Sequence, residues 1–276
     1  MVNTSDLDDV NTDHKILPFP PIRKGVEDLL WAGSQKHVVH GITEVDVSKP
    51  RAILNAYKAK NGISLSFTAY LLKCLGQAVD ENKYMHAYRK GKDKLVLFNE
   101  VDVSTIIERE NAEMVGKKIP TTFVLRAANK KSFLQINDEI RAAQTEDLTK
   151  GPKSERMNLY LKLPRWIRRA YWRKLDRDPM IRKKMGGTVG LTAIGMFTNG
   201  NIGWAIPITP TTLTVTVGGI YPKPLVIDNK IEIREVLCIT VSIDHDIIDG
   251  GPATRFILRF MELIKDGNDL ECLHEK

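Results

Sequence analysis

The stretch VLCITVSIDHDIIDGGPATRFILRFMELI, residues 236–264, contains the pattern that decides the fold. Its first eight residues are almost continuously apolar and β-branched, which predicts a strand that is buried on both faces. Pro252 suits the first turn of a helix, and the apolar residues after it recur at helical spacing. His245 therefore lies where a rigid strand ends and a loop leads into a helix, a common setting for a reactive side chain.

The segment HDIIDG at residues 245–250 combines a histidine, a carboxylate four residues later and a turn-forming glycine. An imidazole has an unperturbed pKa of about 6.5, so His245 is a candidate general base near neutral pH. Asp249 could orient the imidazole, or it could turn away and pair with an arginine. Taken alone, the HxxxDG pattern also fits an ordinary strand–turn–helix junction with an incidental histidine.

Helices alternate with strands in the first half of the chain, and strands dominate the second half. We predict helices at residues 23–31, 51–60, 66–79, 132–143 and 252–264, with Ser132 as an N-cap. We predict strands at residues 38–47, 94–98, 101–107, 121–127, 187–194, 202–208, 213–220 and 231–243. This order predicts a flexible tail at residues 1–15 and one mixed-sheet α/β domain at residues 16–276.

The composition argues against several classes of protein. No apolar run approaches the roughly 18 residues of a transmembrane helix, and the acidic N-terminus lacks the parts of a secretory signal. The three cysteines, Cys74, Cys238 and Cys272, form no CxxC pair, so we expect free thiols in a reducing cytoplasm and no metal site.

Positive charge is concentrated in one segment. The chain has a net charge of +7, but residues 150–184 hold thirteen Lys and Arg against three acidic residues, which leaves about −3 elsewhere. This segment could bind coenzyme A phosphates, an anionic membrane surface or an acidic partner, or it could be a solvated amphipathic helix packed on the domain. No nucleic-acid motif accompanies the charge, so we do not expect nucleic acid. The apolar stripe of the predicted helix consists of Leu163, Trp166, Ile167, Ala170 and Tyr171.

Roughly residues 18–267 resemble a known protein family. The segment DHDIIDGGPATRFILRFMELI resembles the C-terminal signature of the catalytic domain of dihydrolipoamide acyltransferases, the E2 components of 2-oxoacid dehydrogenase complexes. It is more distantly similar to chloramphenicol acetyltransferase. Four further segments resemble the same family in matching order, namely residues 20–48, 64–82, 125–143 and GTVGLTAIGMF at 187–197. The resemblance implies a chloramphenicol acetyltransferase-like two-layer α/β sandwich with a mixed sheet.

The resemblance also implies roles for individual residues. His245 would deprotonate the acceptor thiol of coenzyme A or dihydrolipoamide, and the thiolate would attack an acyl thioester directly, without an acyl-enzyme. Thr192 stands where the family has a serine that hydrogen-bonds the oxyanion, a contribution of typically about 3–4 kcal/mol to the barrier. Asp249 would form a structural ion pair with Arg23. Coenzyme A or acyl-CoA would be a substrate.

The family pattern implies a homotrimer, or a larger assembly of trimers, with the histidine and the oxyanion donor on neighbouring subunits. This chain departs from the pattern in three ways. We find no lipoyl attachment site or subunit-binding domain, and we expect a free-standing relative. Asp246 follows the histidine where the family usually has arginine. A basic helical insertion occupies about residues 145–186.

Three other functions remain open on the sequence. The acyl acceptor could be a hydroxyl or an amine in place of a thiol. The chain could be a non-catalytic, E2-like scaffold that assembles partners through its basic segment. It could also be a basic protein that associates with membranes. Retention of His245, Asp249 and a hydroxyl at Thr192 favours an enzyme that acts on a small-molecule acyl donor and acceptor.

Overall fold

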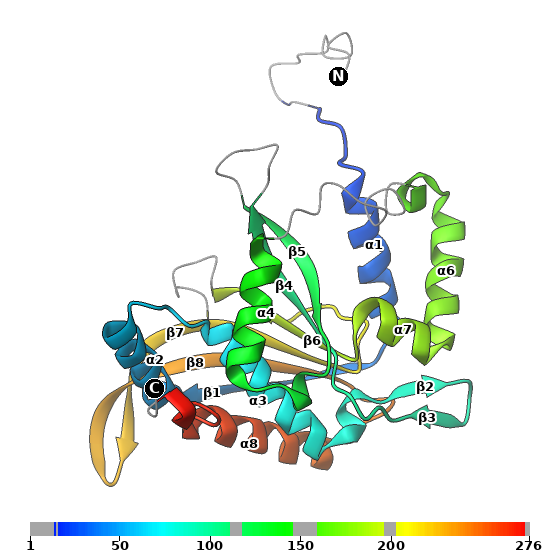
Figure 1. The fold of residues 1–276 in the computed structure, drawn as a ribbon. Helices are drawn as coiled ribbons and strands as arrows, with labels where there is room; N and C mark the ends of the chain where they lie inside the picture. Colours follow the sequence, from blue (N-terminus) through cyan, green and yellow to red (C-terminus); the bar gives the residue numbers. More distant parts are fainter. Residues whose placement is uncertain (1–13, 15, 111–117, 146–158, 196–202, 274–276) are drawn as a thin grey trace.

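The computed structural model describes residues 14, 16–110, 118–145, 159–195 and 203–273 (Figure 1). Its centre is a six-stranded sheet in the order β1-β8-β7-β6-β4-β5. The strands are β1 (Val38–Asp46), β4 (Val103–Glu110), β5 (Lys118–Leu125), β6 (Val189–Ala193), β7 (Leu213–Ile227) and β8 (Lys230–Asp244). β6 runs parallel to both β4 and β7, and the other neighbours are antiparallel, so the sheet is mixed as predicted. The predicted tail lies almost wholly outside the described residues.

Helices pack on one face of this sheet, and a second group lies beside it (Figure 1). The helices are α1 (Ile22–Gly33), α2 (Ser48–Asn61), α3 (Phe67–Glu81), α4 (Phe133–Thr145), α6 (Arg165–Arg177), α7 (Pro179–Gly186) and α8 (Gly250–Asp266). Ser132 is the predicted cap of α4. Its hydroxyl accepts a hydrogen bond from the Gln135 amide (3.3 Å), and the Gln135 side chain accepts one from the Ser132 amide (2.9 Å). These reciprocal bonds form a capping box.

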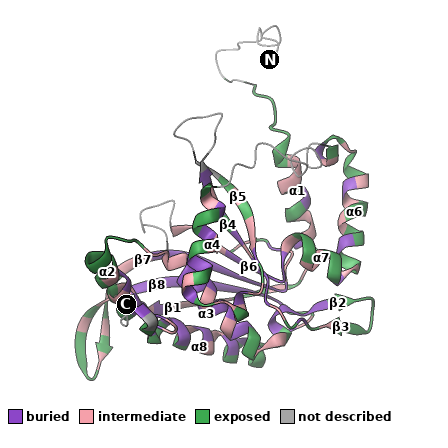
Figure 2. Cartoon of the chain, in the orientation of Figure 1, coloured by how far each residue is buried: buried purple, intermediate pink, exposed green. Residues whose placement is uncertain are grey.

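The core lies between the sheet and helices α3, α4 and α8, where buried residues gather (Figure 2). Alternate strand residues such as Leu213, Val215 and Val217 point to this side, because side chains alternate between the two faces of a strand. β8 is buried on both faces from Val236 to Asp244, which confirms the prediction made from its continuous apolar run. This rigid strand carries His245 at its end.

The structure corrects the prediction of a strand at residues 202–208. Residues 203–208 form no ladder. The carbonyl oxygen of Gly203 accepts a hydrogen bond from the amide of Gly219 on β7 (3.3 Å), and the Trp204 indole donates one to the carbonyl oxygen of Thr43 on β1 (2.9 Å). Pro207 and Pro210 explain the difference, because proline has no amide hydrogen to donate to a sheet.

Three elements extend or add to the predicted set. β2 (Tyr88–Lys90) pairs with β3 (Lys94–Val96) in a short hairpin. β7 continues beyond a bulge after Val217 and forms a projecting hairpin with β8. The amides of Met180 and Ile181 donate to the Asp178 side chain, which therefore caps the unpredicted helix α7.

The basic helix α6 packs against α1, but not through the predicted apolar stripe. Its buried residues are Arg168 and Leu175, whereas Trp166 from the predicted stripe is 72% exposed. The Arg168 guanidinium donates to the buried carboxylate of Asp28, with Nε 2.6 Å from Oδ2. The prediction that the apolar stripe is buried was wrong. The buried acid Asp28 on α1 needs a cationic partner, so Arg168 faces the interface in place of the apolar residues. Helix α6 is therefore an amphipathic helix that packs on the domain through α1.

Candidate active site

The turn that follows β8 is held by two consecutive residues from the α1–β1 connection. The Lys36 ammonium forms an ion pair with the carboxylate of Asp244, and both side chains are largely buried. The amide of His245 donates to the carbonyl oxygen of His37 (2.8 Å). The amides of Ile247 and Ile248 both donate to the carbonyl oxygen of Asp244 (3.1 Å each). The backbone of His245 is thus fixed, and its side chain is exposed at the sheet edge.

Asp246 does not act on His245 through a direct hydrogen bond. Its carboxylate lies 3.0 Å from Nδ1 of His37, and both side chains are exposed. This contact is a third link between the turn and the α1–β1 connection. The carboxylate that departs from the family pattern therefore helps to hold the turn that carries the histidine.

The predicted ion pair between Arg23 and Asp249 does not form within the described part of the chain. Arg23 is exposed in the first turn of α1, and Asp249 is exposed at the N-cap of α8, where its side chain makes no capping hydrogen bond. Lys36 and Asp244 form the buried ion pair at this site instead.

Thr192 lies on β6, on the face of the sheet opposite the helices. β6 alternates buried and half-buried residues, and Thr192 is half-buried. It stands opposite Thr216 of β7, which stands opposite Thr240 of β8, so three hydroxyl-bearing residues form one row across the sheet. The hydroxyls of Thr216 and Thr240 are buried and have no hydrogen-bond partner among the described residues. Thr192 is the least buried of the three, and its hydroxyl is therefore the donor in this row that is most open to a negatively charged oxygen.

One chain does not bring His245 and Thr192 together. Thr240 lies in the row of Thr192, two strands away, and precedes His245 by five positions. At about 3.3 Å per residue and about 4.8 Å between strands, the separation is roughly 19 Å. A single substrate carbonyl cannot contact both side chains of the same chain.

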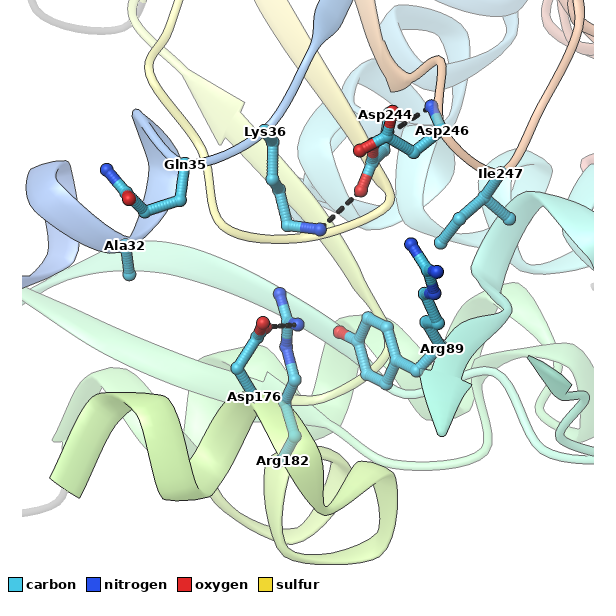
Figure 3. Close-up of a pocket in the computed structure, with 10 residues that line it drawn as sticks. Ala32, Gln35, Lys36, Arg89, Asp176, Arg182, Asp244, Asp246 and Ile247 are labelled. Atoms are coloured by element: carbon cyan, nitrogen blue, oxygen red, sulfur yellow. Dashed lines mark hydrogen bonds and ion pairs between the residues drawn. The ribbon is translucent and has the colours of Figure 1, made fainter. Parts of the chain in front are cut away.

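A cavity of about 190 Å³ lies beside the histidine turn (Figure 3). Asp244 and Asp246, the two neighbours of His245, line it on one side. Ile247 of the same turn also lines it. The remaining lining residues come from the end of α1, the α1–β1 connection, β2 and the basic segment, namely Ala32, Gln35, Lys36, Tyr88, Arg89, Asp176 and Arg182.

The two cysteines with described side chains offer no nucleophile. Cys74 and Cys238 are buried free thiols, as predicted. Burial raises the pKa of Cys74 to about 12, and burial also raises the pKa of Cys238. Both thiols therefore stay protonated near neutral pH. In the described part of the chain, no three His, Cys, Asp or Glu residues gather into a metal-binding group, and no helix is long and apolar enough to cross a membrane.

Sequence reasoning missed Lys36 and Thr216. Lys36 lies between a helix and a strand and shows no local sign of its partner 208 positions away. The alternation Thr-Val-Thr-Val at residues 214–217 does mark a strand with hydroxyls on one face, and the register with β6 then places Thr216 beside Thr192.

A model of the family described as "2-oxoacid dehydrogenases acyltransferase (catalytic domain)" matches residues 11–158 and 153–272. The chain belongs to this acyltransferase family. Among curated relatives, it is 25% identical over 259 residues to the lipoamide acyltransferase component of the branched-chain α-keto acid dehydrogenase complex of Bacillus subtilis. It is 23% identical over 282 residues to the succinyltransferase component of the 2-oxoglutarate dehydrogenase complex of Buchnera aphidicola. These alignments cover 91% and 96% of this chain, but 52% and 59% of the relatives, so the chain spans little more than half of their length.

Solved structures of the family share the fold. A probable dihydrolipoamide acetyltransferase from Listeria monocytogenes is similar with a TM-score of 0.67 and 22% identity, over 94% of this chain and 97% of that chain. The cubic core of a pyruvate dehydrogenase multienzyme complex gives a TM-score of 0.66 and 19% identity, over 94% and 95% of the two chains. The predicted fold class, a two-layer α/β arrangement with a mixed sheet, is confirmed.

Proposed function

We propose that this acyltransferase moves an acyl group between coenzyme A and the thiol of a dihydrolipoamide-like acceptor, with His245 as the general base. The observation that carries the proposal is the placement of His245. Its side chain is exposed, while its backbone follows directly on β8 and its amide donates a hydrogen bond to the carbonyl oxygen of His37. The imidazole is therefore accessible to a substrate, while the backbone that carries it stays fixed.

In the proposed reaction, a nitrogen of the His245 imidazole takes the proton of the acceptor thiol. The resulting thiolate sulfur attacks the thioester carbonyl carbon, and the carbonyl oxygen becomes an oxyanion. The Thr192 hydroxyl donates a hydrogen bond to this oxyanion, and Thr216 stands beside it in the same row. The intermediate collapses, the carbon–sulfur bond to the donor breaks, and the imidazolium returns its proton to the leaving thiolate. No acyl-enzyme forms.

We further propose that two subunits build each site, in a homotrimer or an assembly of trimers. The separation of roughly 19 Å between His245 and Thr192 supports this arrangement, because one chain cannot supply both groups to one carbonyl. The β7–β8 hairpin also presents an apolar face to solvent, which is typical of a surface that another subunit covers. Its exposed residues are Val226, Ile231 and Ile233.

Acyl exchange between acetyl-CoA and dihydrolipoamide tests the proposal. Because one thiol replaces another, the products must be followed by chromatography, whereas transfer to a hydroxyl or amine would release a net thiol. We expect exchange by the wild-type chain, and its loss in His245→Ala with an unchanged oligomer on gel filtration. Full turnover by His245→Ala would refute the role of the histidine.

The same assay separates the alternatives. Net thiol release with an alcohol or amine acceptor, and none with dihydrolipoamide, would replace the thiol acceptor in the proposal. Absence of coenzyme A binding by calorimetry would favour a non-catalytic scaffold. His14→Ala is a matched control, because it changes an exposed histidine near the N-terminus.

A further inference from the structure

The cavity beside the histidine turn joins the candidate site to the basic segment. Asp176 of α6 and Arg182 of α7 form one wall, and Lys36 and Asp244 form the opposite wall (Figure 3). Arg89 of β2 also lines the cavity, and the guanidinium groups of Arg89 and Arg182 point into the same space. At about 30 Å³ per water molecule, its 190 Å³ can hold a small polar group together with several carbon atoms.

The three carboxylates of the cavity each have a cationic or hydrogen-bonding partner. Asp244 pairs with Lys36, Asp176 pairs with Arg182, and Asp246 contacts the imidazole of His37. None of these three carboxylates pairs with Arg89, the third cationic residue of the cavity lining after Lys36 and Arg182.

Arg89 has hydrogen-bonding capacity to spare. Within the described residues it forms no ion pair, and one nitrogen, Nη2, donates to the carbonyl oxygen of Lys92 (3.0 Å). A guanidinium has five N–H donors, and two of them can bind one carboxylate or phosphate side by side. Arg89 therefore offers the cavity a positive charge with donors that can bind an anion.

Arg182 supplies a second, pre-ordered donor. Its guanidinium lies over the Tyr88 ring, with Cζ 4.2 Å from the ring centroid, and Asp176 holds Nη1. Its Nη2 is buried and has no hydrogen-bond partner among the described residues. A buried donor without an acceptor costs free energy, so an incoming oxygen acceptor would be stabilised here.

We propose that this cavity binds an anionic oxygen group of the thioester substrate, with Arg89 as its specificity-determining residue and Arg182 as a second donor. The inference rests on the proposed acyl transfer, because it assumes that a thioester binds at His245. The group is either a carboxylate at the far end of the acyl chain or a phosphate of coenzyme A. Both carry the same chemistry, and kinetics distinguishes them.

The test compares the wild-type chain with Arg89→Gln on three donors, acetyl-CoA, succinyl-CoA and acetyl-3′-dephospho-CoA. Loss of a charge-assisted bidentate contact should raise KM roughly tenfold or more, with a smaller change in kcat. An increase limited to succinyl-CoA identifies the acyl carboxylate. An increase for acetyl-CoA that disappears with the dephosphorylated donor identifies the 3′-phosphate, and an equal increase on all three donors identifies the diphosphate that they share. Equal KM values of the two proteins on all three donors would overturn the proposal.

Lys90→Gln is the matched control, because it removes one positive charge from the same short strand outside the cavity lining. It should leave every KM unchanged, and an equal effect of Lys90→Gln would overturn a specific role for Arg89. Arg89 is exposed, so its replacement should leave the melting temperature unchanged.

If the wild-type chain transfers no acyl group, the proposed function fails and the cavity is tested by binding alone. Calorimetry with coenzyme A and with succinyl-CoA then compares the wild type with Arg89→Gln. Binding of either probe that weakens tenfold in the variant supports the cavity as an anion site. Equal affinities, or no binding by the wild type, overturn it.

Discussion

The ammonium of Lys36 forms an ion pair with the buried carboxylate of Asp244, one residue before the candidate catalytic histidine. Lys36 follows α1, and Asp244 ends β8, so the pair joins an early and a late segment of the chain at the site. The adjacent hydrogen bond from the His245 amide to the carbonyl oxygen of residue 37 makes the link continuous. The position of the histidine therefore depends on a residue that does no chemistry.

Replacing Lys36 with methionine should destabilise the protein strongly. Asp244 would remain buried without its partner, and such a change typically costs about 3–5 kcal/mol in the free energy of unfolding. Denaturant unfolding measures the loss. Lys60→Met, at an exposed position of α2, should change stability by less than about 0.5 kcal/mol. A Lys36→Met variant as stable as this control would show that the pair contributes nothing.

Arg23→Gln should have almost no effect on stability or acyl transfer. Arg23 is exposed and forms no ion pair with Asp249, so its loss leaves no buried charge. We expect a change within about 0.5 kcal/mol in thermal or denaturant unfolding. A loss of several kcal/mol would restore the ion pair that the family resemblance implies.

Mixed oligomers should recover activity that neither parent has. Thr192→Val removes the hydroxyl that would bind the oxyanion, and one such donor is typically worth 10²–10³ in kcat. Co-refolding Thr192→Val with His245→Ala creates some interfaces that have both native residues, about a quarter of all sites in a randomly mixed trimer. Exchange kinetics before and after mixing measure the recovery. A mixture as inactive as its parents would place both groups on one subunit.

Breaking the contact between α1 and α6 should loosen the basic helix. Asp28 is 1% exposed and receives hydrogen bonds from Arg168 and from the Tyr160 hydroxyl (2.8 Å). Arg168→Met should leave this carboxylate unpaired and cost about 3–5 kcal/mol. Limited proteolysis should then cut α6 faster. Arg165 is exposed on the same helix, so Arg165→Met is the control, and its α6 should be cut at the wild-type rate.

Stability should fall as the pH drops from about 6.5 to about 4, because burial lowers the pKa of the His86 imidazole to about 4. The unfolded chain, with an ordinary pKa of about 6.5, binds a proton in this range that the folded chain does not bind. Acid therefore favours unfolding, by a free energy on the order of 3 kcal/mol at the lower end. Urea unfolding across this range measures the slope. The slope should flatten in His86→Gln and persist in His14→Gln.

The sequence was sufficient for elements whose signal is local. The β8 strand, the turn at His245 and helix α8 follow one another directly between Lys230 and Asp266, and the apolar patterns of the strand and the helix identify both. β2 escaped prediction because two of its three residues, Arg89 and Lys90, are charged, and it lacks the apolar and β-branched residues that mark a strand.

The arrangement of the site could not be predicted from the sequence, because it depends on the pairing of strands that are far apart in the chain. The row of hydroxyls at Thr192, Thr216 and Thr240 exists only through the register of three strands. The stripe expected on α6 failed for a related reason, since Asp28 on a distant helix determines which face is buried.

The pairing of β1 with β8 also has a consequence during synthesis on the ribosome. β1 emerges first among the strands, yet its partner is the last strand to be made. Until then, its backbone amides and carbonyls form an unpaired edge of the kind that other chains can join. We therefore expect the turn that carries His245 to be among the last parts to form, and chains that stop before residue 244 to be prone to aggregation.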